Sequence, residues 1–103
     1  MQEITSRNNP ICVHLKKLGT SKSYRDEHGE FLCDGFKLLE EAVSVGAQIK
    51  TVLSTVDINI KLPAETHVYK AQKSLINSLS PLKNAQDVIF TCCCGEYNDF
   101  VYQ

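Results

Sequence analysis

The sequence predicts an α/β domain in which helices cover a central sheet of about four strands. Short runs of apolar and β-branched residues alternate along the chain with segments whose apolar residues recur at helical spacing. Such an alternation is typical of layered α/β domains. The length of 103 residues allows one domain with one modest hydrophobic core.

The N-terminal residues predict a frayed tail and then a helix. Residues 1–6 are mostly polar, and we expect them to fray. Asn9 and Pro10 form a typical helix start, because the residue before proline prefers extended backbone and proline suits the first helical position. Apolar residues then recur at helical spacing as far as Leu18, and Gly19 is a suitable stop.

A buried strand and a second helix follow in the sequence. Residues 20–30 are polar and charged, and they predict a loop or an extension of the first helix. The apolar run in Glu30–Asp34 predicts a short buried strand, which ends in a turn at Asp34-Gly35. Residues 36–45 predict a helix with one apolar face, closed by Gly46.

The second half of the chain predicts three more strands and one more helix. Residues 49–54 are rich in β-branched side chains and predict a strand, whereas residues 56–65 are ambiguous. Residues 68–71 predict a short strand, and residues 73–79 predict a short helix. Residues 87–94 predict the last strand of the sheet.

The charged residues are distributed unevenly along the chain. Residues 1–25 hold five basic residues and Glu3 as the only acidic one, a net charge of +4, whereas residues 26–103 carry −5. A basic end on a mildly acidic body suggests a surface that faces a polyanion, although charge alone equally allows a solvated helix face. The chain has no apolar run of membrane-spanning length and no signal peptide, so we expect a soluble, cytoplasmic domain.

The sequence offers little that is typical of an enzyme or a metal site. It contains no P-loop, GxGxxG, HExxH or GxSxG motif. The three histidines lie far apart in the sequence and are expected at the surface, although a Cys–His nucleophile pair stays open. The five cysteines have no CxxC spacing, which argues against zinc. The run Cys92–Cys94 is better explained as small apolar residues in a buried strand of a reduced protein.

The stretch from the first helix to the second combines cations with a glycine turn. We expect Lys22, Arg25 and Lys37 to converge near the end of the Glu30–Asp34 strand, where backbone N–H groups of Gly35 and the helix start suit a phosphate. Asp34 is expected to cap that helix whatever the function.

Tyr24 lies among these cations and has two interpretations. It is either a stacking platform for an RNA base or a half-buried tyrosine of the core, and the sequence favours neither.

Many residues of the chain follow, in order, the pattern of a known family. The matching positions are Ser6-Arg7-Asn8-Asn9-Pro10, Leu15-Lys16-Lys17-Leu18, Lys22, Arg25, Gly29, Phe31-Leu32-Cys33-Asp34-Gly35, Lys37-Leu38-Leu39, Glu41-Ala42, 49–53, Val68-Tyr69, Leu79-Ser80 and Val88-Ile89. With these residues the chain resembles the N-terminal substrate-binding domain of the SpoU/TrmH RNA 2′-O-ribose methyltransferases. It departs from the family at Val13, where a lysine is usual, at Asp34, where a glutamate is usual, and at Ala85-Gln86-Asp87, where the family has Pro-Gln-Gly.

The resemblance implies a fold, a partner and a division into domains. The fold is an α/β/α sandwich with a mixed sheet, like that of the kink-turn-binding ribosomal proteins. Residues 1–95 would bind RNA, most often ribosomal, and residues 96–103 would be a linker or a cut end. A separate, knotted C-terminal domain would bind S-adenosylmethionine, form the homodimer and transfer the methyl group, so this chain would hold no catalytic residue. The expected RNA contacts are Arg7, Lys16, Lys17, Lys22, Arg25, Asp34, Gly35 and Lys37.

Two other functions remain compatible with the sequence. The chain would instead be a stand-alone RNA-binding protein of ribosomal type, with no methyltransferase domain attached. Alternatively, it is a protein-interaction or dimerisation domain that meets a partner chain rather than RNA.

Overall fold

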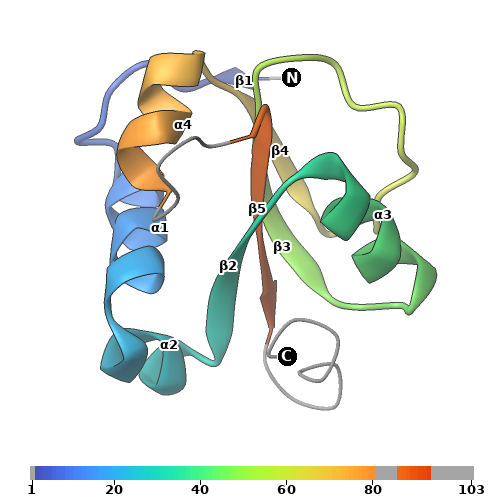
Figure 1. Ribbon diagram of the computed structural model, residues 1–103, viewed down its shortest axis with the longest axis horizontal. Coiled ribbons are helices and arrows are strands. Elements are labelled where there is room, and N and C mark those ends of the chain that lie inside the picture. Colours follow the sequence, from blue (N-terminus) through green and yellow to red (C-terminus); the bar gives the residue numbers. More distant parts are fainter. Residues whose placement is uncertain (1, 81–85, 94–103) are drawn as a thin grey trace.

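The computed structural model describes residues 2–80 and 86–93, which form a mixed five-stranded sheet between two layers of helices (Figure 1). The strands are β1 (Gln2–Glu3), β2 (Glu30–Asp34), β3 (Ile49–Ser54), β4 (His67–Lys70) and β5 (Val88–Cys93). The helices are α1 (Pro10–Thr20), α2 (Lys22–His28), α3 (Phe36–Ser44) and α4 (Lys73–Leu79). The predicted α/β sandwich is confirmed.

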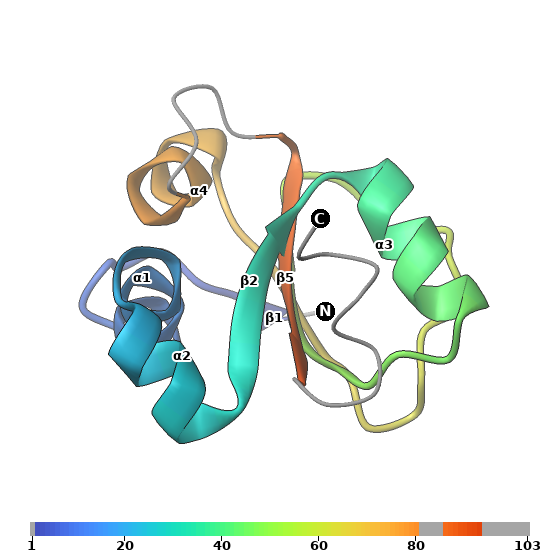
Figure 2. The same cartoon turned by 60° about the horizontal axis from the view of Figure 1, so that its bottom comes forward.

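The strand order is β1-β4-β3-β5-β2. Strands β1, β4 and β3 run parallel, and β5 is antiparallel to both β3 and β2. Helices α1, α2 and α4 cover one face of the sheet, and α3 covers the other, together with the irregular connection over residues 55–66 (Figure 2). The chain therefore builds a separate apolar cluster on each face.

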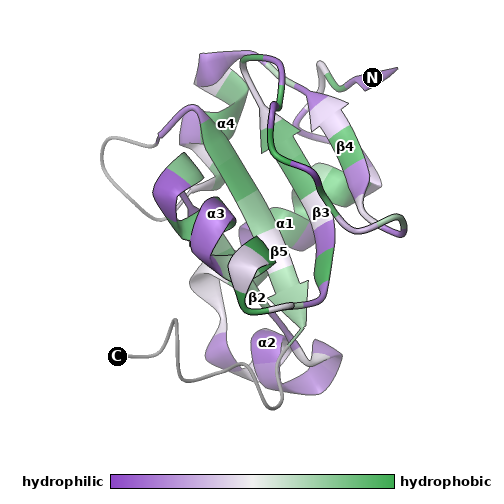
Figure 3. Ribbon diagram, turned by 90° about the vertical axis from the view of Figure 1, so that its right-hand side faces the viewer, coloured by the Kyte–Doolittle hydropathy of each residue, from purple (hydrophilic) through white to green (hydrophobic). Residues whose placement is uncertain are grey.

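The interior strand β5, which lies between β3 and β2, contributes to both clusters. Val88, Phe90 and Cys92 point into the cluster under α3, and Ile89 points into the cluster under α1 and α4. Figure 3 shows β5 as a largely hydrophobic strand that crosses the whole domain. Cys92 is buried, as the sequence predicts, whereas Cys93 is only half-buried and Cys94 lies outside the described residues.

The buried thiols of β2 and β5 meet in the cluster under α3. Cys33 and Cys92 are both free cysteines with at most 5% exposure. A hydrogen bond with Cys92, together with burial, raises the pKa of the Cys33 thiol far above its ordinary value. The Cys33 thiol therefore stays protonated at neutral pH, and both buried cysteines act as small apolar side chains.

The prediction of a frayed N-terminal tail is wrong. Gln2 and Glu3 pair in parallel with β4, and the Ile4 N–H donates to the Lys70 carbonyl at 2.8 Å. Ile4 is only 3% exposed and belongs to the cluster under α1 and α4. A strand of two residues has no readable periodicity, and this one exists because β4 offers a free edge.

The α1–α2 segment combines confirmed and corrected predictions. Asn9 caps α1 as predicted, and its side chain accepts a hydrogen bond from the Ile11 N–H at 2.9 Å. The helix continues past the expected stop at Gly19, and Ser21 then ends α1 and caps α2. Most of residues 20–30 thus form a separate helix, rather than a loop or an extension of the first helix. Gly29 ends α2 in the left-handed conformation at φ 63°, which favours glycine.

The rest of the sheet differs from the prediction in detail. Strand β4 begins one residue earlier than expected, and the buried Ala71 lies just beyond its end. Residues 56–65 form no helix or strand, and Ile58, Ile60 and Leu62 of this segment pack against the cluster under α3. A bulge between Ile49 and Val52 lets both residues reach that cluster although they are three positions apart.

The buried position of Ile4 predicts a large loss of stability when its side chain is truncated. We expect Ile4→Ala to lower the free energy of unfolding by about 2–5 kcal/mol, because it empties a packed site in the cluster. Urea denaturation followed by circular dichroism measures this difference. Gln2→Ala, at the exposed neighbouring position, is the control and should change stability by no more than about 0.5 kcal/mol. Equal stability of the two variants would contradict the assigned role of the N-terminus.

Thr91 carries a buried hydroxyl that has no hydrogen-bond partner among the described residues. The residue is fully buried in β5. Because desolvation of an unpaired hydroxyl is unfavourable, we expect the isosteric change Thr91→Val to raise the free energy of unfolding by about 1 kcal/mol. The same denaturation experiment checks the sign, and a destabilised Thr91→Val protein would show that the hydroxyl has a partner.

Candidate nucleic-acid interface

The cations that the sequence singles out divide between the two helical layers. Helix α2 immediately precedes β2, whereas α3 follows it, so Lys22 and Arg25 lie at the start of the strand and Lys37 lies at its end. The two helices are accordingly seen at opposite ends of β2 in Figure 1. The predicted convergence of Lys22, Arg25 and Lys37 is therefore wrong. A strand of five residues separates them, about 16 Å of extended chain.

A different set of residues lies along the last turns of α1 and on α2. We call this surface the α1–α2 patch, and it consists of Lys17, Lys22, Tyr24, Arg25 and His28. The Lys17 ammonium lies 5.6 Å from the centre of the Tyr24 ring, within the range of a cation–π contact. Lys22 is 81% exposed and pairs with Asp26 at 2.8 Å. Such an exposed pair contributes little to stability, so Lys22 can exchange Asp26 for a phosphate at small cost.

Arg25 joins the two helices of the patch. Its side chain is half-buried, and its Nη1 donates to the carbonyl oxygen of Leu18 at 2.7 Å. That carbonyl belongs to the last turn of α1, where carbonyl groups lack partners within the helix. Because a guanidinium has five N–H donors, this bond leaves Arg25 able to bind a second acceptor.

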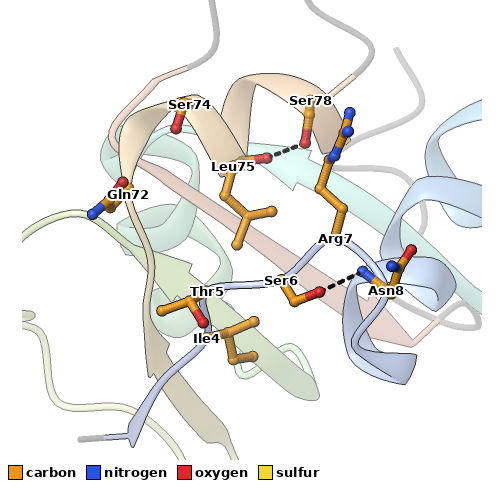
Figure 4. Close-up of a pocket in the computed structure, with 9 residues that line it drawn as sticks. All are labelled: Ile4, Thr5, Ser6, Arg7, Asn8, Gln72, Ser74, Leu75 and Ser78. Atoms are coloured by element: carbon orange, nitrogen blue, oxygen red, sulfur yellow. Dashed lines mark hydrogen bonds between the residues drawn. The ribbon is translucent and has the colours of Figure 1, made fainter.

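Arg7 and Lys16 lie beside α4 rather than in the patch. The Lys16 Nζ donates to the Ser78 carbonyl oxygen at 2.9 Å. Figure 4 shows the exposed Arg7 side chain near Ser78, at the rim of a pocket of about 570 Å³ between the N-terminal segment and α4. The pocket is lined by Ile4, Thr5, Ser6, Arg7, Asn8, Gln72, Ser74, Leu75 and Ser78.

The turn at Asp34-Gly35 differs from the prediction in one respect. Gly35, and not Asp34, is the N-cap of α3, and the helix start has no side-chain cap. Asp34 lies one residue too early, and its carboxylate instead accepts hydrogen bonds from the Ser80 hydroxyl at 2.7 Å and the Gln86 N–H at 2.9 Å. Asp34 thus ties the end of β2 to the chain that leaves α4 and enters β5.

The uncapped start of α3 lies beside an exposed lysine. Gly35 has φ 108°, a conformation that side chains rarely adopt, and Lys37 follows in the first turn of the helix. Asp34, Gly35 and Lys37 line a shallow hollow of about 250 Å³ together with Phe36, Leu38, Glu41 and Gln86. The backbone N–H groups predicted to suit a phosphate are therefore not satisfied by a side-chain cap.

The loop before β5 carries a second carboxylate with defined partners. The Asp87 carboxylate accepts from Lys73 Nζ and from Thr55 Oγ1, each at 3.1 Å. The Lys73 ammonium and the Thr55 hydroxyl hold the pKa of Asp87 below its usual range. Of the Ala85-Gln86-Asp87 segment, Ala85 lies outside the described residues.

The sequence analysis missed a hydrogen-bonded group that holds α2 in place. The His14 ring lies 2.7 Å from the Tyr24 hydroxyl through Nδ1 and 3.0 Å from Glu30 Oε1 through Nε2. The centres of the His14 and His28 rings are 5.4 Å apart, although these histidines are distant in the sequence. Tyr24 and His28 are four residues apart on one helix, which is the signal that could have placed them side by side.

Tyr24 follows the half-buried alternative of the sequence analysis. Its ring stacks on His28 with the centres 3.9 Å apart, so one face of Tyr24 is covered. His28 and His67 are exposed, as expected, and His14 is 28% exposed. Of the stacked Tyr24 and His28 rings, His28 is therefore the one that is more exposed to solvent.

The described residues, 2–80 and 86–93, hold no cluster of three or more side chains suited to a metal ion. None of their helices is long and apolar enough to cross a membrane.

Comparison with known proteins assigns the family. The family model of the MRM3-like substrate binding domain matches residues 9–89. The chain belongs to this family. The match begins at the cap of α1 and ends inside β5, so it includes the α1–α2 patch and the Asp34-Gly35 turn.

Solved structures with the same fold are longer proteins. An rRNA methyltransferase from Sinorhizobium meliloti is 27% identical with a TM-score of 0.75, and the match covers 91% of this chain and 37% of that one. An RNA 2′-O ribose methyltransferase is 22% identical with a TM-score of 0.73, covering 93% of this chain and 39% of that one. The SpoU methyltransferase AviRb from Streptomyces viridochromogenes is 21% identical with a TM-score of 0.62. This match covers 85% of this chain and 36% of AviRb. The predicted resemblance to the substrate-binding domain of SpoU/TrmH methyltransferases is confirmed.

This chain thus spans a little more than a third of the length of these methyltransferases. No curated protein matches it.

The two hydrogen bonds of Asp34 predict that this carboxylate stabilises the domain. We expect Asp34→Ala to lower the free energy of unfolding by about 1.5–3 kcal/mol, since hydrogen bonds to a charged acceptor are lost. Asp34→Asn keeps one acceptor oxygen and should lose less. Thermal denaturation compares both with Asp57→Ala, a change at an exposed aspartate on the other side of the sheet. If Asp34→Ala were as stable as the Asp57 control, the carboxylate would have no structural role.

Proposed function

We propose that this chain is the RNA-recognition domain of an S-adenosylmethionine-dependent RNA 2′-O-ribose methyltransferase acting on ribosomal RNA in the cytoplasm. The cations of the α1–α2 patch bind the RNA backbone, and so do Arg7 and Lys16 beside α4. Lys37 and the N–H groups at the start of α3 form a second contact near Asp34 and Gly35. The observation that carries the proposal is that Lys17 lies over one ring of the Tyr24–His28 aromatic pair, on a helical surface of a substrate-binding domain.

The chemistry of the patch supports RNA over other polyanions. Lysine and arginine neutralise phosphates, and exposed aromatic rings bind the faces of unpaired bases. The patch offers both within one pair of helices, because Lys17 lies over Tyr24 and Arg25 bridges to Leu18. The side chains of Lys17 and Lys22 are exposed and long enough to follow a flexible backbone.

Methyl transfer belongs, in this proposal, to the remainder of a longer protein. An rRNA methyltransferase from Sinorhizobium meliloti was crystallised with AdoMet bound, and the match to this chain covers 37% of it. We place cofactor binding, the reaction and homodimer formation outside residues 1–95. The part played by these residues is to hold the RNA so that one ribose reaches the reacting centre.

The proposal predicts RNA binding that weakens with salt and depends on Lys17. Binding of a labelled single-stranded RNA should fall steeply between about 50 and 200 mM potassium chloride, because each neutralised phosphate adds about −0.7 to the log–log slope. Lys17→Gln should make this slope shallower by about 0.7. Fluorescence anisotropy measures both. Lys17 tests the patch better than Arg25, whose loss would also remove the bond to Leu18.

A matched control variant distinguishes RNA binding by the patch from binding by any exposed cation. Lys61 is equally exposed but lies in the connection on the α3 side of the sheet, so Lys61→Gln should leave the slope unchanged. An equal effect of the two variants would mean that RNA is bound without preference for the patch. RNA affinity that does not respond to salt would contradict the proposed function.

A further inference from the structure

We propose that His28, supported from behind by Tyr24, is a stacking platform for an unpaired nucleobase. This inference rests on the proposed function and specifies the RNA that the domain prefers, which is a single strand, loop or bulge with an accessible base. Sequence analysis placed a possible platform at Tyr24. The geometry assigns the role to the neighbouring histidine instead.

The two rings already form a stack. Tyr24 and His28 occupy positions four apart on α2, with ring centres 3.9 Å apart and planes inclined by 30°. His28 is exposed, whereas Tyr24 is half-buried. A base that extends this stack therefore meets the histidine ring first.

The orientation of the His28 ring is held by a second contact. Its Nδ1 lies 2.9 Å from the carbonyl oxygen of Tyr24. A carbonyl oxygen only accepts, so Nδ1 carries the hydrogen and donates it. Because stacking and this hydrogen bond hold the same ring, little side-chain freedom is left to lose when a base binds.

Tyr24 is held just as firmly, through His14, to the edge of the sheet. Glu30 in β2 is buried and accepts from His14 Nε2 at 3.0 Å. In the neutral ring, Nδ1 is then the acceptor for the Tyr24 hydroxyl at 2.7 Å. A chain of hydrogen bonds thus connects the platform to β2.

The surroundings of the platform suit a nucleotide rather than an uncharged aromatic ligand. Lys17 lies 5.6 Å from the Tyr24 ring centre, and Lys22 and Arg25 are carried by the same short helix as the platform. Lys17 therefore supplies a cation beside the stacked rings, next to the position of a base that stacks on His28. This combination of an aromatic face and a basic surround is the usual means of binding single-stranded RNA.

The test uses the full chain and a short single-stranded RNA with 2-aminopurine at one central position. The protein has no tryptophan, so the probe's fluorescence is observed without interference from indole. We expect quenching of the probe on binding to the unmodified chain. His28→Ala should lose this quenching and bind about 5- to 30-fold more weakly, the lower part of the range for loss of one base–aromatic stack. His28→Phe, which keeps an aromatic face, should restore both, and His67→Ala at the exposed start of β4 should change neither.

The other outcomes separate the platform from the proposed function. If His28→Ala binds and quenches like the unmodified chain while binding still depends on salt, the platform is wrong and RNA recognition stands. If His28→Phe binds RNA as weakly as His28→Ala, then the hydrogen bond of the imidazole matters for binding and its aromatic face does not. That result also contradicts the stacking proposal. If the unmodified chain binds no RNA at any salt concentration, the proposed function and the platform fall together.

Discussion

The architecture depends on the burial of β5 on both of its faces. Val88, Phe90 and Cys92 fill one apolar cluster, and Ile89 fills the other, all with no exposed surface. A strand that is apolar on both sides requires a covering layer on each side of the sheet. The α1, α2 and α4 layer and the α3 layer are the consequence.

This two-layer arrangement determines where the cations lie. Lys17, Lys22 and Arg25 precede β2 and stay on the α1 side, whereas Lys37 follows β2 and lies on α3. RNA that contacts both groups has to extend along the length of β2, rather than fill a single hollow. The carboxylate of Asp34 holds the far end of this path through Ser80 and Gln86.

The near end of the path is held by hydrogen bonds together with one aromatic ring. Helix α2 has seven residues and none of them is fully buried, and its Tyr24 ring packs against the cluster under α1 and α4. Arg25 bonds to the end of α1, and Tyr24 is connected through His14 to the buried Glu30. These bonds make a solvated helix rigid enough to present an aromatic ring and cations in a constant arrangement.

Much of the secondary structure follows from the sequence alone, because it depends on interactions between residues that are close together in the chain. The Asn9 cap, the alternation along β5 and the Gly35 turn depend on neighbouring residues, and so the α/β class and the family pattern could be predicted. Pairing between distant segments could not, because a two-residue strand such as β1 leaves no periodic signal. The candidate interface shows the same division between local and long-range information. Its cations could be predicted from the charged residues of the sequence. Their division between layers, the role of Asp34 and the contact of His14 with Tyr24 were decided only by the tertiary structure, since each depends on which elements the sheet brings together.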